Sequence, residues 1–183
     1  MKRYAGFSAA ETLVVLAISV ILLGVAMPDL ASLARQQQLK AAVTDLLGAI
    51  NLTRSEAISR GARVELAPLE PAGANWRLGW VVFVDADGNR RPGPGEEIIA
   101  RHGALPDGIR IASVFSSQQQ PDYIAYNGAG RACSAASSAA ARWGTLSLFQ
   151  DRETRRIKIN MLGRARVCDP RRDNVGCSGA DDP

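Results

Sequence analysis

A long apolar run at residues 7–27 constrains this chain more than any other feature of its sequence. As a helix rising about 1.5 Å per residue, the run would be about 31 Å long, enough to cross a bilayer core of about 30 Å. Lys2 and Arg3 lie just before it, and basic residues stay on the cytoplasmic side of a membrane helix. The pattern therefore predicts one membrane-spanning segment, with the rest of the chain outside the cytoplasm.

A cleaved secretory signal peptide is the alternative interpretation of this run. Such a peptide has a small-residue cleavage site after its apolar core. Here the core ends in Ala-Met-Pro-Asp at residues 26–29, and an amphipathic helical pattern follows. The sequence therefore favours a retained anchor over simple cleaved export.

Glu11 is the only charged residue in the apolar run. A carboxylate inside a membrane helix costs about 3 kcal/mol, so such a residue is usually retained for a partner. A counter-charge from another subunit would offset the cost, because a pair of charges interacts strongly where water is excluded. The simpler alternative is an isolated acid in a plain membrane anchor.

The arrangement Gly6-Phe7-x-x-x-Glu11, after a short basic leader, resembles the processing site of type IV prepilins and pseudopilins. The resemblance implies that a prepilin peptidase removes residues 1–6 by cutting between Gly6 and Phe7, and that the new terminus at Phe7 is N-methylated. It also implies that Glu11, then the fifth residue, pairs with the Phe7 amine of a neighbouring subunit during filament assembly. Residues 7–28 would form the transmembrane and filament-core helix.

The helix is expected to continue through residues 29–61 as an amphipathic segment. Apolar or small residues recur there at spacings of three and four, the pattern of a helix that lies on a core: Leu39, Val43, Leu46, Ile50, Thr53 and Ala57. Leu47 and Ile58 should widen this stripe. Pro28 lacks a backbone N–H and should kink the helix, and Gly61 is a natural C-terminal stop.

Residues 62–183 hold short β-like runs separated by Gly, Pro, Asn and Asp, at residues 63–68, 76–85, 97–101, 109–115, 123–126, 145–149, 156–160 and 164–168. No run alternates with a helix, so the sheet should be antiparallel. The run at 76–84 is apolar on both faces, which indicates a central strand. The predicted fold class is α+β: a long N-terminal helix packed on an antiparallel sheet or sandwich, with an irregular basic tail.

This organisation resembles the GspH/FimT family of minor type IV pilins and pseudopilins. The likeness is carried by residues 6–28, by Gly-Trp-Val-Val-Phe-Val-Asp at residues 79–85, and by Gly-Arg-Ala-Arg at residues 163–166. It implies a type IV pilin-like fold and a filament subunit rather than an enzyme. It also implies a start in the bacterial inner membrane, with a periplasmic C-terminal domain, and later incorporation into a pilus or pseudopilus at the cell surface.

The motif at residues 163–166 resembles the GRxR motif of FimT-type minor pilins, where it contributes to DNA binding. In a strand, Arg164 and Arg166 would point to the same face. Gly163 allows a tight turn that presents them. Arg171 and Arg172 follow shortly after, so these four arginines are the expected DNA-binding residues.

Residues 152–172 carry eight basic residues against two acidic ones, in a chain whose formal charge of +4 falls to +2 once Lys2 and Arg3 leave with the leader. Such a cluster can hold the phosphates of double-stranded DNA without reading its sequence. No aromatic residue is interleaved, so base stacking has little support. The alternative is a solvated arginine-rich hairpin that protects a sheet edge from aggregation.

The three cysteines are Cys133, Cys168 and Cys177. The periplasm is oxidising, so an exported domain can hold a disulfide, and the odd count leaves one thiol unpaired or paired elsewhere. A Cys168–Cys177 bridge is our first expectation, and Cys133–Cys168 is the competitor. The ligand spacing of a zinc site is absent, and we expect no metal and no cofactor.

An acidic segment superficially resembles a calcium loop, with oxygens at Asp85, Asp87, Asn89 and Glu96. Arg90 occupies the position where such a loop has glycine, so a hairpin turn with Asp-Gly at its tip is the favoured interpretation.

The single histidine, His102, is expected at the surface or at a strand end, and no nucleophile motif supports catalysis. The three tryptophans, Trp76, Trp80 and Trp143, are expected in the core or in subunit interfaces.

Two functions of different classes remain open from the sequence, beside the weaker option of a single-pass anchored domain with no filament role. One is a minor pilin at the tip of a type IV pilus, which primes assembly and binds DNA during natural transformation. The other is a minor pseudopilin of a type II secretion system, which binds no nucleic acid. The expected partners are other pilin or pseudopilin subunits, the prepilin peptidase and the inner membrane, with double-stranded DNA in the first case.

Overall fold

The computed structural model describes residues 8–70, 72–173 and 175–180, with the backbone alone at residues 23–29. The chain divides into two compact units, Met1–Gln37 and Gln38–Pro183. The predicted cleavage site at Gly6 and Phe7 lies outside the described residues.

In the first unit, the helix α1 (Ala9–Arg60) begins at a reciprocal capping pair. The Ser8 backbone N–H donates to Glu11 Oε2 at 2.9 Å, and the Glu11 N–H donates to Ser8 Oγ at 3.3 Å. This is a capping box, which satisfies backbone groups that a helix start leaves unpaired. Glu11 therefore has a structural role in the isolated chain, as a helix cap, which its place in the apolar run did not indicate.

The first unit exposes a long run of apolar side chains. Ten large ones are between 51% and 67% exposed: Leu13, Val14, Val15, Leu16, Ile18, Val20, Ile21, Leu22, Leu30 and Leu33. Within the part of the chain that the structure describes, no helix is both long and apolar enough to cross a membrane. The helix is continuous through Pro28, whose side chain lies outside those described, so the kink stays a prediction.

In the second unit, the remainder of α1 buries the stripe that its periodicity predicts. Its six members are at most 5% exposed: Leu39, Val43, Leu46, Ile50, Thr53 and Ala57. Leu47 packs against the same core. Ile58 is 51% exposed, so its predicted place in the stripe is wrong. The helix ends at Arg60, and Gly61 follows with φ +60°, as expected of a C-terminal stop.

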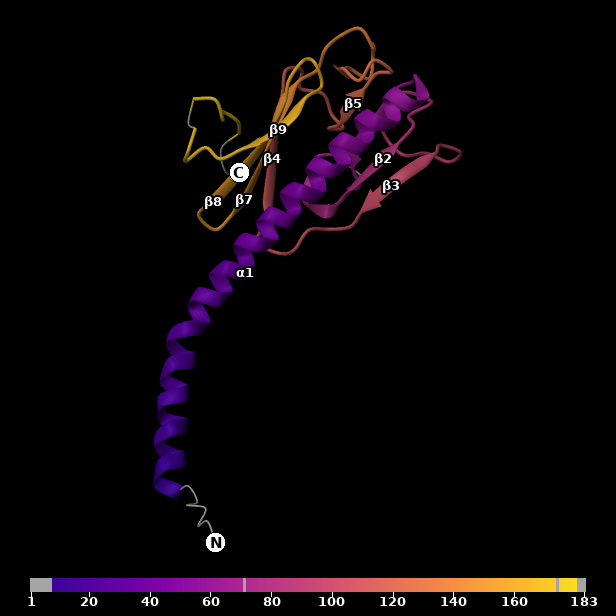
Figure 1. Ribbon diagram of the computed structural model, residues 1–183. Coiled ribbons are helices and arrows are strands. Elements are labelled where there is room, and N and C mark those ends of the chain that lie inside the picture. The colour runs from indigo at the N-terminus through magenta and orange to yellow at the C-terminus, as the bar shows by residue number, and fades with distance from the viewer. Residues whose placement is uncertain (1–7, 71, 174, 181–183) are drawn as a thin grey trace. The chain divides into compact units, whose positions relative to one another are not determined.

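Two antiparallel sheets complete the second unit (Figure 1). The first has the strand order β3-β2-β1-β5-β6, with bounds β1 (Val64–Pro68), β2 (Trp80–Phe83), β3 (Ile98–His102), β5 (Ile124–Tyr126) and β6 (Ala132–Cys133). The second has the order β4-β7-β8-β9, with bounds β4 (Arg110–Phe115), β7 (Gly144–Gln150), β8 (Glu153–Ile159) and β9 (Ala165–Cys168). Every described pairing is antiparallel, as the sequence predicts.

The main core lies where α1 meets both sheets, because its members come from all three. A second cluster covers the other face of the first sheet and includes Val81, Phe83 and Tyr123. Since both faces of β2 are covered and β2 lies between β3 and β1, the prediction of a central strand is confirmed.

One predicted strand is too long. Residues 76–78 form a short 3₁₀ helix, η1 (Trp76–Leu78), and not the start of the strand. Asn75 caps η1 by accepting a hydrogen bond from the Arg77 N–H, and Gly79 ends it with φ +106°. The strand begins only at Trp80, because the chain turns at a glycine that the period-two pattern did not reveal. The two-residue strand β6 was also missed.

A buried ion pair joins segments from both sheets. Arg142 Nη2 donates to Asp122 Oδ1 at 3.1 Å, and both side chains are at most 7% exposed. Asp122 Oδ2 accepts from Trp76 Nε1 at 2.8 Å and from Ser113 Oγ at 2.6 Å. The Arg142 guanidinium lies between the rings of Phe115 and Tyr123, 4.0 and 4.1 Å from their centres. This network fixes the chain just before β7.

Candidate nucleic-acid interface

The basic cluster predicted at residues 152–172 lies in the turn before β8, on β8, on β9 and in the segments that follow these two strands. Ile157 and Ile159 of β8 face the core, so Arg156 and Lys158 point to the outer face of the second sheet. Lys158 is paired with Arg166 of β9 in the strand register. We call this set the basic surface: Arg152, Arg155, Arg156, Lys158, Arg164, Arg166, Arg171 and Arg172.

Gly163 shapes the turn between β8 and β9. Its φ is +76°, a conformation that glycine adopts without steric cost. Its N–H donates to the Asn160 carbonyl at 2.9 Å, while Asn160 Oδ1 accepts the N–H groups of Leu162 and Arg164, each at 3.0 Å. The prediction that Gly163 permits a tight turn is confirmed.

Arg164 and Arg166 have different surroundings. The expected strand at 164–168 begins one residue later, so Arg164 belongs to the turn and is exposed. Among the described residues, no hydrogen bond or ion pair involves its guanidinium. Arg166 is also exposed, but its Nη2 donates to the Gly176 carbonyl at 2.5 Å.

The C-terminal tail lies against the outer face of the second sheet. Arg156 donates to the carbonyls of Cys177 at 2.7 Å and Ala180 at 3.0 Å. Lys158 Nζ donates to the Gly176 carbonyl at 3.1 Å and to Ser178 Oγ at 3.0 Å. Several cations of the basic surface therefore hold the tail in place, a role that charge counting did not reveal.

The disulfide expected first is the one that forms. Cys168 and Cys177 are bridged, with Cα atoms 5.8 Å apart, and Cys133 is a buried free thiol. Burial raises the pKa of the Cys133 thiol to about 11. The competing Cys133–Cys168 pairing is absent, and the bridge closes the tail loop that carries Arg171 and Arg172.

The two tail arginines also differ. Arg171 Nη1 donates to Glu153 Oε1 at 2.8 Å, and its Nη2 donates to the Arg152 carbonyl. Arg172 is exposed, and no side-chain contact is described for it within the residues of the structure. Arg155 is paired with Glu153 and Asp169, each at 3.2 Å. Arg164 and Arg172 are thus the most available of the four predicted DNA-binding residues.

The acidic segment forms a loop between the paired strands β2 and β3, as the turn interpretation predicts. Ligand oxygens of Asp85, Asp87 and Glu96 lie within 4.8 Å of one another. Backbone N–H groups of the loop donate to all three carboxylates, including Gly88 to Asp85 and Ala86 to Glu96, both at 2.8 Å. Hydrogen bonding within the loop accounts for this arrangement.

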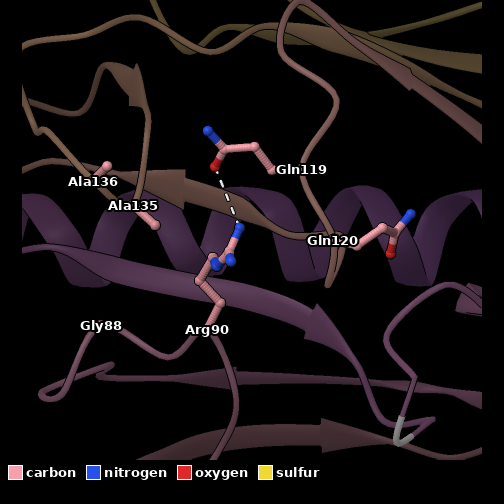
Figure 2. A pocket seen from close by; sticks show the side chains of 6 residues that line it. All are labelled: Gly88, Arg90, Gln119, Gln120, Ala135 and Ala136. Atoms are coloured by element: carbon pink, nitrogen blue, oxygen red, sulfur yellow. Dashed lines mark hydrogen bonds between the residues drawn. The ribbon is translucent and has the colours of Figure 1, made fainter.

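A cavity of about 380 Å³ lies beside this loop and is shown in Figure 2. Arg90 extends across it and donates to Gln119 Oε1 at 3.3 Å. Ala135 and Ala136 line the same cavity. No member of the basic surface lines it, so it is separate from the candidate interface.

The single histidine and the three tryptophans have different surroundings. His102 ends β3 and stacks on Trp80, with ring centres 4.2 Å apart, which agrees with a strand-end role. Trp76 and Trp80 are at most 2% exposed, but Trp143 is 43% exposed.

Comparison with known proteins identifies the family. Residues 42–163 match the family described as type II transport protein GspH. The chain belongs to this family. The Thermus thermophilus pilin-like protein PilA1 is 37% identical over 107 residues, which is 58% of this chain and 64% of PilA1. The chain therefore matches slightly less than two thirds of that relative.

Two solved structures share the fold. The type IV minor pilin FimU of Pseudomonas aeruginosa superposes with a TM-score of 0.56 at 16% identity, over 72% of this chain and 89% of FimU. The minor pseudopilin EpsH of the Vibrio cholerae type 2 secretion system gives 0.51 at 15% identity, over 73% of this chain and 98% of EpsH. This GspH-family chain therefore has the fold of minor type IV pilins and pseudopilins.

Proposed function

We propose that this chain is a minor pilin of a type IV pilus and that its basic surface contacts double-stranded DNA during natural transformation. The observation that carries the proposal is the Gly163 turn, which exposes Arg164, whose guanidinium pairs with none of the described residues, two positions before the exposed Arg166. Cations that are not neutralised within the protein are the ones that can replace counter-ions along DNA.

The four arginines predicted to contact DNA differ in the hydrogen bonds that they already make within the protein. Arg164 and Arg172 can meet phosphates without losing a side-chain bond to any described residue. Arg166 and Arg171 already donate to the Gly176 carbonyl and to Glu153, so they lose or share these bonds on binding. An arginine has five N–H donors, so Arg166 and Arg171 can keep their present bonds and still contact a phosphate. Such a shared contact is weaker than one made by an arginine with all its donors available. We expect Arg164 and Arg172 to dominate the affinity.

The first test is a fluorescence-polarisation titration of the detergent-solubilised full chain with a 30-bp duplex. The double substitution Arg164→Ala/Arg172→Ala should weaken binding about tenfold and reduce the salt dependence by about two ions. Lys40→Ala/Arg101→Ala is the matched control, because it removes two exposed cations that lie outside the second sheet. Equal losses in both doubles would show non-specific charge attraction and contradict the proposal.

Membrane anchoring and processing form the second part of the proposal. We infer that residues 7–28 hold the precursor in the inner membrane, that a prepilin peptidase cuts between Gly6 and Phe7, and that Phe7 is then N-methylated. The exposed apolar side chains of the first unit support this, because a filament bundle or lipid would cover them. Mass spectrometry of the membrane form should show a chain that starts at methylated Phe7. A chain that still starts at Met1 would contradict it.

Glu11 is proposed to pair with the Phe7 amine of a neighbouring subunit. Its Oε2 caps the helix, and its Oε1 accepts no hydrogen bond from the described residues. Glu11→Ala should therefore still be processed but should assemble poorly. Glu11→Gln separates the two roles, because an amide oxygen can cap the helix but carries no charge for the amine. Normal assembly of Glu11→Gln would refute the charge pairing.

The alternative function is a minor pseudopilin of a type II secretion system. Its support is the family description and the EpsH fold. A deletion strain distinguishes the two roles. Loss of DNA uptake with normal protein secretion supports the pilus role, and the reverse result supports the pseudopilin.

A further inference from the structure

A second cavity, of about 430 Å³, opens at the outer face of the second sheet. We call it the Trp143 groove, and its walls include Val114, Phe115, Ser116, Trp143, Lys158 and Ser178. Its volume is within the roughly 300–1,000 Å³ range of ligand pockets. Val114, Phe115 and Trp143 make part of its wall apolar, and Lys158 brings a cation of the basic surface to it.

Strand register connects this groove with the basic surface. Val114 of β4 pairs with Thr145 of β7, Thr145 with Lys158 of β8, and Lys158 with Arg166 of β9. These four residues form one row on the outer face, because directly paired residues share a face. With strands about 4.8 Å apart, the row spans about 14 Å. The C-terminal tail crosses this row, because Lys158 and Arg166 both donate to the Gly176 carbonyl and Thr145 is only 7% exposed. A bound strand would therefore pass over the tail, with the groove at one end of the row and the exposed Arg166 at the other.

Trp143 supplies an aromatic surface that the sequence did not associate with the arginines. Its indole is 43% exposed, whereas Trp76 and Trp80 are buried. Its backbone is fixed, since its carbonyl accepts the Ser116 N–H at 2.8 Å and its own N–H donates to Ser116 Oγ at 3.2 Å. The main chain that carries the indole is therefore anchored at the wall of the groove.

We infer that the Trp143 groove holds one unpaired base of single-stranded DNA, stacked on the Trp143 indole, while the N–H donors of Lys158 and Arg166 that the tail does not use contact the adjoining phosphates. The inference rests on the proposed DNA contact and extends it to a second form of the ligand. A base within a duplex is covered by its neighbours, so only an unpaired base can insert into a groove. A stacking aromatic beside a row of cations is the arrangement that binds single strands without sequence preference.

The test measures the intrinsic fluorescence and the affinity of the detergent-solubilised full chain during titration with a 20-nucleotide oligo(dT). Trp143 should be the tryptophan that responds, because the other two are buried. Stacking should quench the emission, and Trp143→Ala should weaken oligo(dT) binding at least fivefold. Trp143→Phe should retain most of the affinity, since it keeps an aromatic face.

Two controls exclude effects of a lost apolar side chain and of unfolding. Leu78→Ala removes an apolar side chain of similar exposure, 42%, that does not line the groove, and it should leave the affinity unchanged. A cooperative thermal transition must be retained in each variant. Equal oligo(dT) affinity of wild type and Trp143→Ala overturns the inference, as does a loss of subunit assembly in Trp143→Ala without any change in affinity.

The duplex titration of Arg164→Ala/Arg172→Ala keeps the two proposals distinguishable. Duplex binding that depends on these arginines, without quenching by oligo(dT), overturns the groove inference and leaves the proposed function intact. Quenching and a Trp143-dependent affinity without duplex binding overturn the duplex proposal and support the groove.

Discussion

Gly163 lies directly against the backbone of Gly130. A Cβ on Gly163 would be 2.4 Å from the Gly130 carbonyl oxygen and 2.7 Å from Cε1 of Tyr126. The turn that carries Arg164 is therefore seated on the first sheet near the end of β5, because no side chain fits between them. Both the left-handed φ and the close approach require glycine at this position.

Gly163→Ala should destabilise the protein more than a positive φ alone explains. Gly88 has nearly the same φ, +78°, but nothing lies within 4 Å of its Cβ position. Gly88→Ala should cost about 1–2 kcal/mol, and Gly163→Ala about 1–3 kcal/mol more, because backbone must move. Urea denaturation of both variants measures the difference. Equal losses would show that the contact with Gly130 does not constrain the turn.

The buried pair of Asp122 and Arg142 should be a second sensitive point. Asp122→Ala leaves the Arg142 guanidinium without its carboxylate and removes the acceptor of Trp76 Nε1. We expect a loss of about 3–5 kcal/mol, the cost of breaking a buried pair. Asp107→Ala is the control, since Asp107 pairs with Arg77 but its side chain is 98% exposed, and it should cost less than about 1 kcal/mol. Similar thermal midpoints for the two variants would contradict this assignment.

Glu65 should make stability depend on pH. Its side chain is fully buried, and burial, with the charge of nearby Asp85, raises its pKa from 4.5 to about 8, although Arg63 opposes the shift. The folded protein thus holds this proton more tightly than the unfolded chain does. As pH rises above 4.5, the unfolded chain ionises first, so the free energy of unfolding should fall until about pH 8, by at most about 1.4 kcal/mol per pH unit.

Glu65→Gln tests this dependence. An amide cannot ionise but keeps the size and a hydrogen-bond donor, so the variant should show a flatter profile of unfolding free energy between pH 5 and pH 8. Chemical denaturation at each pH gives the slope. A variant profile as steep as that of the wild type would assign the dependence to other groups.

Most of the fold was predictable because its signals are local. The stripe from Leu39 to Ala57 follows helical spacing, and all six of its members are buried. The strands were found by composition and turn residues, and their antiparallel pairing followed from the absence of intervening helices. The sequence places Trp76 in a strand, but it lies in η1. The Asn75 cap and the turn at Gly79 determine η1, and neither alters the alternating apolar pattern of residues 76–84.

The site was only partly predictable. The sequence located the Gly163 turn, the cations and the Cys168–Cys177 bridge, which lie close together along the chain. It did not reveal that Arg156 and Lys158 hold the tail, nor that Trp143 lies beside Lys158. Both facts depend on pairing between segments that are distant in sequence, and no periodicity encodes that pairing.

The Cys168–Cys177 bridge should stabilise the protein and leave one of the three cysteines as a free thiol. Cys168→Ser/Cys177→Ser should lose about 2–3 kcal/mol, the value for a loop of about ten residues. In the wild type without reductant, a thiol reagent should find no reactive cysteine in the native protein, because Cys133 is buried and its pKa is raised to about 11. Denaturation should expose one thiol, and reduction should then expose all three. Peptide mapping should identify Cys133 as the single thiol of the unreduced chain. A free thiol at Cys177 would instead reveal the competing Cys133–Cys168 pairing. That pairing would remove the covalent link that keeps the tail against Arg156 and Lys158.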